Sequence, residues 1–204
     1  MISWNPFKKA KPSAARPVTA EDHLAPNAPF NPDNFAPWHG FRKLTPTVLT
    51  GVHDQDLQRA ISNHVRLKED EVRRLGRTLS HQDFTREVLL LNAVWVLEAE
   101  VRNGAFTQYF HRQDAQAVRD AMAGLEMIGA VESLRTLRDA IGLFSYHYEY
   151  LLPLIDEFRL SRPEERPESE TATHDFHVHQ AHLDICRVKF IRSMSASQLA
   201  RSEA

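Results

Sequence analysis

The stretch VLLLNAVWVLEAEVRNGAFTQYF, residues 88–110, decides the fold of this 204-residue chain. Its first part, VLLLNAVWVLEAEV, is apolar on nearly every side of a helix, and a helix of that kind is buried on most sides. Asn103 and Gly104 then stand where a helix would normally end, and an aromatic cluster begins at once at Phe106. The pattern predicts a central helix that ends in a corner, with Gly104 permitting the chain reversal.

This corner is predicted to be structural rather than a ligand site. Asn103 and Gln108 can satisfy the backbone groups that a chain reversal leaves open. The aromatic side chains of the corner are expected to plug the core beside Trp95; they are Phe106, Tyr109 and Phe110.

A helical pattern precedes the central helix. From Asp54 onward, apolar residues recur at spacings of four and three and form one stripe. Gly76 can adopt the left-handed conformation and close this helix. The stripe consists of Leu57, Ile61, Val65, Val72 and Leu75.

The start of the central helix carries its own signals. Ser80 is the expected N-cap, and Asp83 stands three residues on, as in a capping box. Leu79 and Phe84 occupy the two positions of a hydrophobic staple, which would fix the entry of the chain into the helix.

Further helices are predicted after the corner. Two helices follow, the first ended by Gly129, and a last one runs from about residue 174 to 194. The tyrosine-rich residues 146–150 and the LLPLI that follows have the pattern of a short strand, but no partner strand is evident, so a loop or irregular turn is expected. The charged residues 157–173 are expected to form a loop. The fold class is therefore all-α, an irregular bundle of about five helices with an extended Pro-rich N-terminal arm.

The N-terminal quarter differs in composition from the rest. Eight of the eleven prolines fall within residues 1–46, which excludes helix or central strand over any useful length. Because the segment also carries more aromatics than a solvated linker, residues 24–50 are expected to lie as an extended arm across the core, with residues 1–20 mobile. We predict a partly disordered arm over 1–50 and a helical domain over 51–204.

Net charge and cysteine content argue against a nucleic-acid-binding protein and against a disulfide-bonded one. The net charge is −2, whereas a nucleic-acid binder shows a basic excess gathered on one face. The single cysteine, Cys186, can form no intrachain disulfide, which fits a reducing compartment. Without an apolar run long enough for a signal peptide or a membrane span, the chain is expected to be cytoplasmic, with no membrane and no direct nucleic-acid partner.

Four histidines lie close together in HDFHVHQAHLD, residues 174–184: His174, His177, His179 and His182. Histidine is the commonest metal ligand, but on one helix these side chains spread over about 200° and cannot all face one ion. No Glu-x-x-His, His-Glu-x-x-His or cysteine pair supplies further ligands. The sequence predicts no metal site, and the four histidines remain weak candidates for one.

Patterns typical of catalysis are also missing. Cys186 has no base beside it in sequence, and a lone helical cysteine is usually a small buried hydrophobe. Glu98 and Glu100 face different ways on a helix, and Glu98 with Arg102 makes an ordinary i,i+4 pair. The seven glycines are scattered singly and form no phosphate-binding loop. We therefore predict no enzyme activity, no catalytic residue and no cofactor.

An acidic segment, residues 149–175, holds eight acidic and three basic residues, a net charge of −5. A solvated surface loop explains most such runs. Carboxylates spaced along a surface can also present the negative field that a basic protein expects from phosphates. The candidates for such a partner-binding surface are Glu149, Asp156, Glu157, Glu164, Glu165, Glu168 and Glu170.

The central stretch resembles a known family, the bacterial DNA-mimic protein C-terminal-domain family, formerly a domain of unknown function. The similarity lies in the run Trp95-x-x-Glu98-x-Glu100-x-x-Asn103-Gly104-Ala105-Phe106-x-Gln108-Tyr109-Phe110, followed by LEMIGA at 125–130. It extends over about residues 80–195 and departs at Ala105, where the family usually has a second glycine. The motif residues that look structural are Trp95, Glu98, Asn103, Gly104, Phe106, Gln108 and Phe110.

The resemblance implies an all-α, non-enzymatic protein-binding module. In the family's namesake, an acidic surface imitates duplex DNA and occupies the DNA-binding face of a helix-turn-helix regulator, as a dimer. For this chain, the resemblance implies that a basic, DNA-binding protein is sequestered through an acidic surface, with a role in transcription regulation. Two alternatives stay open: an immunity protein that neutralises a toxin, and a metal-binding protein or small metal-dependent hydrolase built on the 174–182 histidines.

Overall fold

The computed structural model describes residues 44–77, 83–161 and 169–199, and over these ranges the chain is all-α, without a strand. The predicted fold class is confirmed. The part of the predicted arm before residue 44 lies outside the described residues. The elements are α1 Pro46–Thr50, α2 Asp54–Arg74, α3 Arg86–Arg112, α4 Ala115–Met127, α5 Val131–Phe144, the 3-10 helix η4 Glu149–Leu151, α6 Leu152–Phe158, α7 Ser169–Val178, α8 Gln180–Ser193 and α9 Ala196–Leu199.

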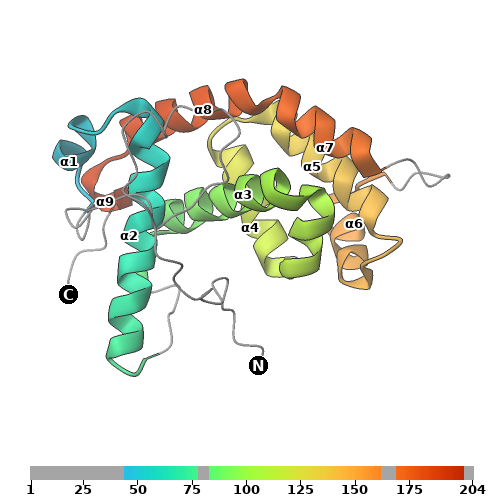
Figure 1. Cartoon of the computed structure of the whole chain (residues 1–204), viewed down its shortest axis with the longest axis horizontal. Helices are drawn as coiled ribbons and strands as arrows, with labels where there is room; N and C mark the ends of the chain where they lie inside the picture. Colours follow the sequence, from blue (N-terminus) through green and yellow to red (C-terminus); the bar gives the residue numbers. More distant parts are fainter. Residues whose placement is uncertain (1–43, 78–82, 162–168, 200–204) are drawn as a thin grey trace, which may run out of the picture. The chain divides into compact units, whose positions relative to one another are not determined.

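Helix α3 is the centre of the fold (Figure 1). It packs on α2, α4, α5, α7 and α9, as its nearly all-round apolar pattern predicted, because such a helix needs neighbours on most sides. Trp95 departs from the prediction, since its side chain is only half-buried. The buried apolar residues in the first half of α3 are Val88, Leu90, Leu91, Val94, Leu97 and Val101.

Helix α3 kinks at the predicted corner and then continues to Arg112. The left-handed residue is Ala105, with φ 63° and ψ −175°, whereas Gly104 has an extended φ of −167°. The positive φ therefore falls one residue after Gly104. Gly104 is still part of the kink, because an added Cβ there would clash with Gln108 Oε1 and lie 2.8 Å from Gln108 Cβ. Beyond the kink, the backbone N–H of Phe106 donates to Thr173 Oγ1 of α7 at 3.4 Å. This contact with a distant helix could not be read from the local sequence.

The polar residues of the corner have partners other than those predicted. Gln108 Nε2 donates to Glu100 Oε2 at 2.5 Å, and Arg112 Nη1 lies 3.2 Å from the same carboxylate oxygen. Glu100 therefore joins the two halves of α3 across the kink. Asn103 is exposed and has no hydrogen-bond partner within the part of the chain that the structure describes. The prediction that Asn103 and Gln108 satisfy backbone groups is wrong.

Replacing Ala105 by glycine is expected to raise the free energy of unfolding by about 1 kcal/mol. A non-glycine residue at this φ and ψ costs about 1–3 kcal/mol, while glycine adds about 0.5–1 kcal/mol of unfolded-state entropy. Urea unfolding measures the change. Ala99→Gly in the regular first half of α3 is the matched control and should lose about 1 kcal/mol. Equal losses in the two variants would show that Ala105 is not strained.

The aromatic side chains of the corner plug the core, as predicted, and each is at most 1% exposed. The ring of Phe106 meets that of Phe176 on α7 edge-on, with centroids 5.5 Å apart. The ring of Phe110 lies 5.1 Å from that of Phe144 on α5, and the Tyr150 hydroxyl donates to the Phe110 carbonyl at 2.8 Å. The second half of α3 is thus held by both α5 and α7.

Helix α4 ends just before Gly129, as predicted. Asp114 is its N-cap and accepts from the Ala117 N–H at 2.9 Å, and Gly129 follows its end with φ 75°. Inside the helix, Gly124 faces α3 so closely that an added Cβ would lie 2.6 Å from the Leu90 carbonyl oxygen. The missing side chain lets the two helices approach each other.

Helix α2 ends where Gly76 takes the left-handed conformation, with φ 68°, which confirms that prediction. Four residues of the predicted apolar stripe are buried, but Leu75 is 67% exposed. The reason is that α2 ends at Arg74, so Leu75 already belongs to the turn and no longer follows the buried face.

The N-cap of α3 is Thr85, five residues later than predicted, so the capping box at Ser80 is wrong. Thr85 Oγ1 accepts from the Val88 N–H at 3.3 Å and donates to the Gln198 carbonyl of α9 at 2.5 Å. Phe84 is buried, while its predicted staple partner Leu79 and Ser80 lie outside the described residues. A contact with the C-terminal segment therefore sets the start of the central helix.

Residues 44–50, the described end of the predicted arm, pack on the core as a short helix rather than an extended strand. Leu49 of α1 is buried. Arg192 of α8 holds this segment, because its guanidinium donates to the Leu49 and Val52 carbonyls and to the Asp54 carboxylate. The turn between α1 and α2 is thereby fastened to α8.

The C-terminal third contains more helix than predicted. Residues 152–158 form α6, with Pro153 in its first turn and Leu154 buried, where the sequence suggested only a loop from residue 157. The last helix begins at Ser169 rather than near residue 174 and is interrupted at His179, which separates α7 from α8. Helix α7 packs on α5 and α3, so tertiary burial of its apolar side chains stabilises its first turns.

Candidate functional site

The acidic surface predicted from the sequence falls on the consecutive elements η4, α6 and α7. Glu149 lies in η4, Asp156 and Glu157 in α6, and Glu170 in the first turn of α7, and all four are exposed. Helix α5 packs on η4, α6 and α7 and so links these elements. The other three predicted candidates lie outside the described residues; they are Glu164, Glu165 and Glu168.

Ion pairs separate these carboxylates into two kinds. Glu157 Oε2 lies 2.7 Å from Arg119 Nε of α4, so a positive charge neutralises it. Within the described residues, Glu149, Asp156 and Glu170 have no ion-pair partner. The surface therefore keeps uncompensated negative charge from three elements, with the exposed Arg159 at the end of α6 as the nearest basic residue in sequence to Asp156.

Two further exposed carboxylates belong to the same group of helices, and the predicted set had left them out. Asp139 lies on α5 and Asp175 on α7, and these two helices pack on each other. Neither has an ion-pair partner within the described ranges. Asp139 precedes the acidic segment in the sequence, and only the contact between α5 and α7 brings its helix to this side.

A second polar group lies inside the molecule, between α3 and α8. Glu98 is 3% exposed and Arg187 is 7% exposed, and the Arg187 guanidinium donates to the Glu98 carboxylate. Gln180 Nε2 donates to Glu98 Oε2 at 2.7 Å, and Asp184 pairs with the other side of the guanidinium. The predicted ordinary pair of Glu98 with Arg102 is therefore not the main one, since α8 covers Glu98.

Burial governs the ionisation of this group. Removal of water from around Glu98 raises the pKa of its carboxyl, and the positive charge of Arg187 opposes that rise. Because both charges are buried and bonded to each other, this group can orient α8 on α3, but it offers no open position to a ligand. The sequence contained one indication that Arg187 is buried. It follows Leu183 and precedes Ile191 at spacings of four, and these two residues lie on the buried face of α8.

The four histidines are distributed over α7, the break and α8, with His179 half-buried and the others exposed. No group of three metal-ligating side chains comes together within the part of the chain that the structure describes. Burial, together with the positive charges of Arg102 and His174, lowers the pKa of His177. His182 Nε2 lies 3.6 Å from Cys186 Sγ one turn along α8.

A long apolar helix is also absent from the described ranges. None of the helices in residues 44–77, 83–161 and 169–199 is long and apolar enough to cross a membrane. The central helix α3 has 27 residues and a long apolar run, but charged residues interrupt it, among them Glu98, Glu100 and Arg102.

Comparison with known proteins gives one match. A family model described as DMP19-like protein matches residues 82–193, which is more than half of the chain. Neither the curated proteins nor the solved structures include a match. The matched region runs from just before α3 to the end of α8 and contains the corner, the buried Glu98–Arg187 pair and the acidic elements. The chain belongs to the DMP19-like family of DNA-mimic proteins, a family with a protein-binding role, which confirms the resemblance seen in its central stretch.

Proposed function

We propose that this chain is a non-enzymatic module that sequesters a basic, DNA-binding protein through the acidic side formed by η4, α6 and α7. Membership of the DNA-mimic family carries the proposal. The exposed carboxylates of Glu149, Asp156 and Glu170, which have no ion-pair partner within the described ranges, support it. A partner that binds DNA presents Lys and Arg side chains to phosphates, and such side chains would meet these carboxylates in the same way.

The pairing of several carboxylates elsewhere on the surface supports the choice of this side. Asp56, Asp70, Glu71 and Glu132 each lie within an ion pair to an Arg or Lys three residues away. A paired carboxylate contributes little field at a distance, because its countercharge cancels most of it. The negative potential that a basic partner senses therefore comes mainly from carboxylates without such a neighbour.

The test replaces Glu149, Asp156 and Glu170 by their amides in the full-length protein. Wild-type protein immobilised on a resin should capture a basic protein from native cell extract at about 50 mM salt and lose most of it at about 200 mM. A short DNA duplex should displace the captured protein, since both would compete for one binding face. The triple variant should capture markedly less than the wild type at low salt.

A matched control removes three carboxylates elsewhere. Asp70→Asn, Glu71→Gln and Glu132→Gln lie on α2 and α5 in exposed ion pairs, and this triple variant should capture as much as the wild type. Capture that is indifferent to salt, or that both triple variants reduce equally, would contradict binding through the acidic side. Capture of a toxin in place of a DNA-binding protein would still support binding through the acidic side, but it would show that the partner is a toxin.

A further inference from the structure

A groove lies along helix α4 and borders the acidic side at the end of α6, where Glu157, which is paired with Arg119, lines it. Its floor is α4, one wall is the first turn of α3, and the other wall is α5 with the end of α6. Its volume is about 740 Å³. Ligand sites in proteins commonly have volumes of about 300–1,000 Å³, so the groove can hold a ligand of substantial size. We call it the α4 groove.

The α4 groove has an apolar bed. Leu89 from α3, Met122 and Ala123 from α4, and Phe158 from α6 line it. Met122 is almost fully buried, while the other three are half-buried and keep part of their surface in contact with water. Covering these side chains would remove apolar surface from water, which favours an apolar ligand group along the bed.

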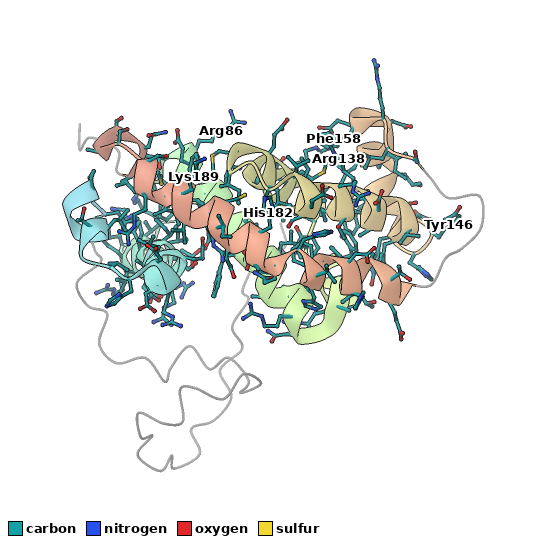
Figure 2. All side chains as sticks on the ribbon, turned by 90° about the horizontal axis from the view of Figure 1, so that it is seen from above. Arg86, Arg138, Tyr146, Phe158, His182 and Lys189 are labelled. Carbon is teal, nitrogen blue, oxygen red and sulfur yellow. The ribbon has the colours of Figure 1, made fainter. Side chains whose placement is uncertain are left out.

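Two arginines of the groove have guanidinium groups that are free of ion pairs to any described residue. Arg86 and Arg138 are exposed, line the groove and have no ion-pair partner among the described residues, whereas Arg119 is paired with Glu157. Figure 2 shows Arg138 beside Phe158 and Arg86 at a distance from both, so the two free guanidinium groups are separated. A guanidinium binds a carboxylate through two parallel hydrogen bonds, which makes carboxylates its natural partners.

The acidic residues of the groove restrict the ligand further. Asp120 accepts from Gln116, and Glu126 is exposed without an ion-pair partner among the described residues. These carboxylates would repel a densely negative ligand such as a nucleic acid or a polyphosphate. A ligand with two separate carboxylates, matched to Arg86 and Arg138, avoids this repulsion.

We propose that the α4 groove binds a short segment of a partner protein in which two acidic residues flank apolar side chains. The apolar side chains cover Leu89, Met122 and Phe158, and the flanking carboxylates bind Arg86 and Arg138. Peptide segments commonly bind in helical grooves through apolar anchors in this manner. The groove does not include Glu149, Asp156 or Glu170, and its free arginines favour carboxylates rather than basic side chains. The proposal therefore does not depend on the proposed sequestering function.

The test selects binders from a displayed library of random twelve-residue peptides on the full-length protein. The enriched peptides should carry Leu, Ile or Phe between Asp or Glu residues. The strongest of them, labelled with a fluorophore, should bind an Arg86→Glu/Arg138→Glu variant at least about tenfold more weakly than wild type in an anisotropy titration. Both arginines are exposed, so circular dichroism and melting should show an unchanged fold.

Matched variants separate this site from the acidic side. Arg73→Glu/Arg135→Glu changes two exposed arginines outside the groove and should bind the peptide as the wild type does. The amide variant of Glu149, Asp156 and Glu170 should also bind it normally, and the groove variant should keep salt-sensitive capture of a basic protein. The absence of enrichment, enrichment of lysine-rich peptides, or equal affinity for the groove variant would each overturn the proposal.

Discussion

Replacement of Arg187 by methionine is expected to lower the free energy of unfolding by about 3–5 kcal/mol at about pH 8. The Arg187 guanidinium is buried and bonded to the carboxylates of Glu98 and Asp184. Methionine keeps much of the apolar stem but leaves the Glu98 carboxylate, 3% exposed, without its countercharge. An uncompensated buried charge is strongly destabilising, because the hydrogen bond from Gln180 replaces neither the lost water nor the lost countercharge.

This loss should shrink as the pH falls. Burial raises the pKa of Glu98 even in the wild type, and without Arg187 its folded-state pKa should rise further above the unfolded value. A carboxyl with a raised folded-state pKa takes up its proton first in the folded protein, so acid stabilises the folded state relative to the unfolded one. The penalty is therefore full above the folded-state pKa and declines below it. Urea unfolding of both proteins between about pH 5 and pH 8 measures this difference.

Two controls accompany the Arg187 variant. Glu98→Gln combined with Arg187→Met should recover most of the lost stability, since no charge then remains buried and Gln180 can still bond the amide. Arg135→Met removes an exposed arginine that pairs with Glu132 and should change stability by less than about 1 kcal/mol. A loss that is independent of pH would show that Glu98 is not left as a buried charge.

Gly124→Ala should lower the free energy of unfolding by about 1–3 kcal/mol, although alanine is the better helix former by about 1 kcal/mol. An added Cβ would lie 2.6 Å from the Leu90 carbonyl oxygen and 2.6 Å from Val94 Cγ2. The carbonyl belongs to the backbone of α3, so the contact can be relieved only if one helix moves away from the other. That movement would loosen the packing between the central helix and α4.

Thermal and urea unfolding measure the Gly124 effect. Gln116→Ala, on the exposed side of the same helix, is the matched control and should change stability by no more than about 0.5 kcal/mol. If Gly124→Ala instead stabilised the protein, helix propensity alone would govern this position. The close approach of α3 and α4 would then not limit the size of its side chain.

Much of the fold was predictable because its signals are local. The apolar pattern of residues 88–101 predicted the central helix, and Gly76 and Gly129 marked two helix ends, where both adopt a positive φ. The start of α3 could not be predicted from local signals, because it depends on a contact that is distant in the sequence. Thr85 caps that helix and also bonds the Gln198 carbonyl, a contact with the far end of the chain.

The candidate surface was predictable in part. Composition located the acidic segment, but it did not distinguish Glu157, which pairs with Arg119, from Glu149 and Asp156, which have no ion-pair partner among the described residues. Nor did it indicate the α4 groove, because the groove is formed by side chains from four helices. The charge on a surface depends on which residues meet there, and helix packing decides this.

The amino-acid sequence alone specified an all-α chain around one apolar helix, because the period of apolar residues and the left-handed preference of glycine act within a few residues. Tertiary contacts decided the geometry of the corner and the partner of its buried carboxylate. Phe106 bonds Thr173, 67 residues away, and Glu98 bonds Arg187, 89 residues away. Contacts over such sequence distances form only when the whole chain packs, so the local pattern located the kink but not its positive φ, which lies at Ala105 rather than at Gly104.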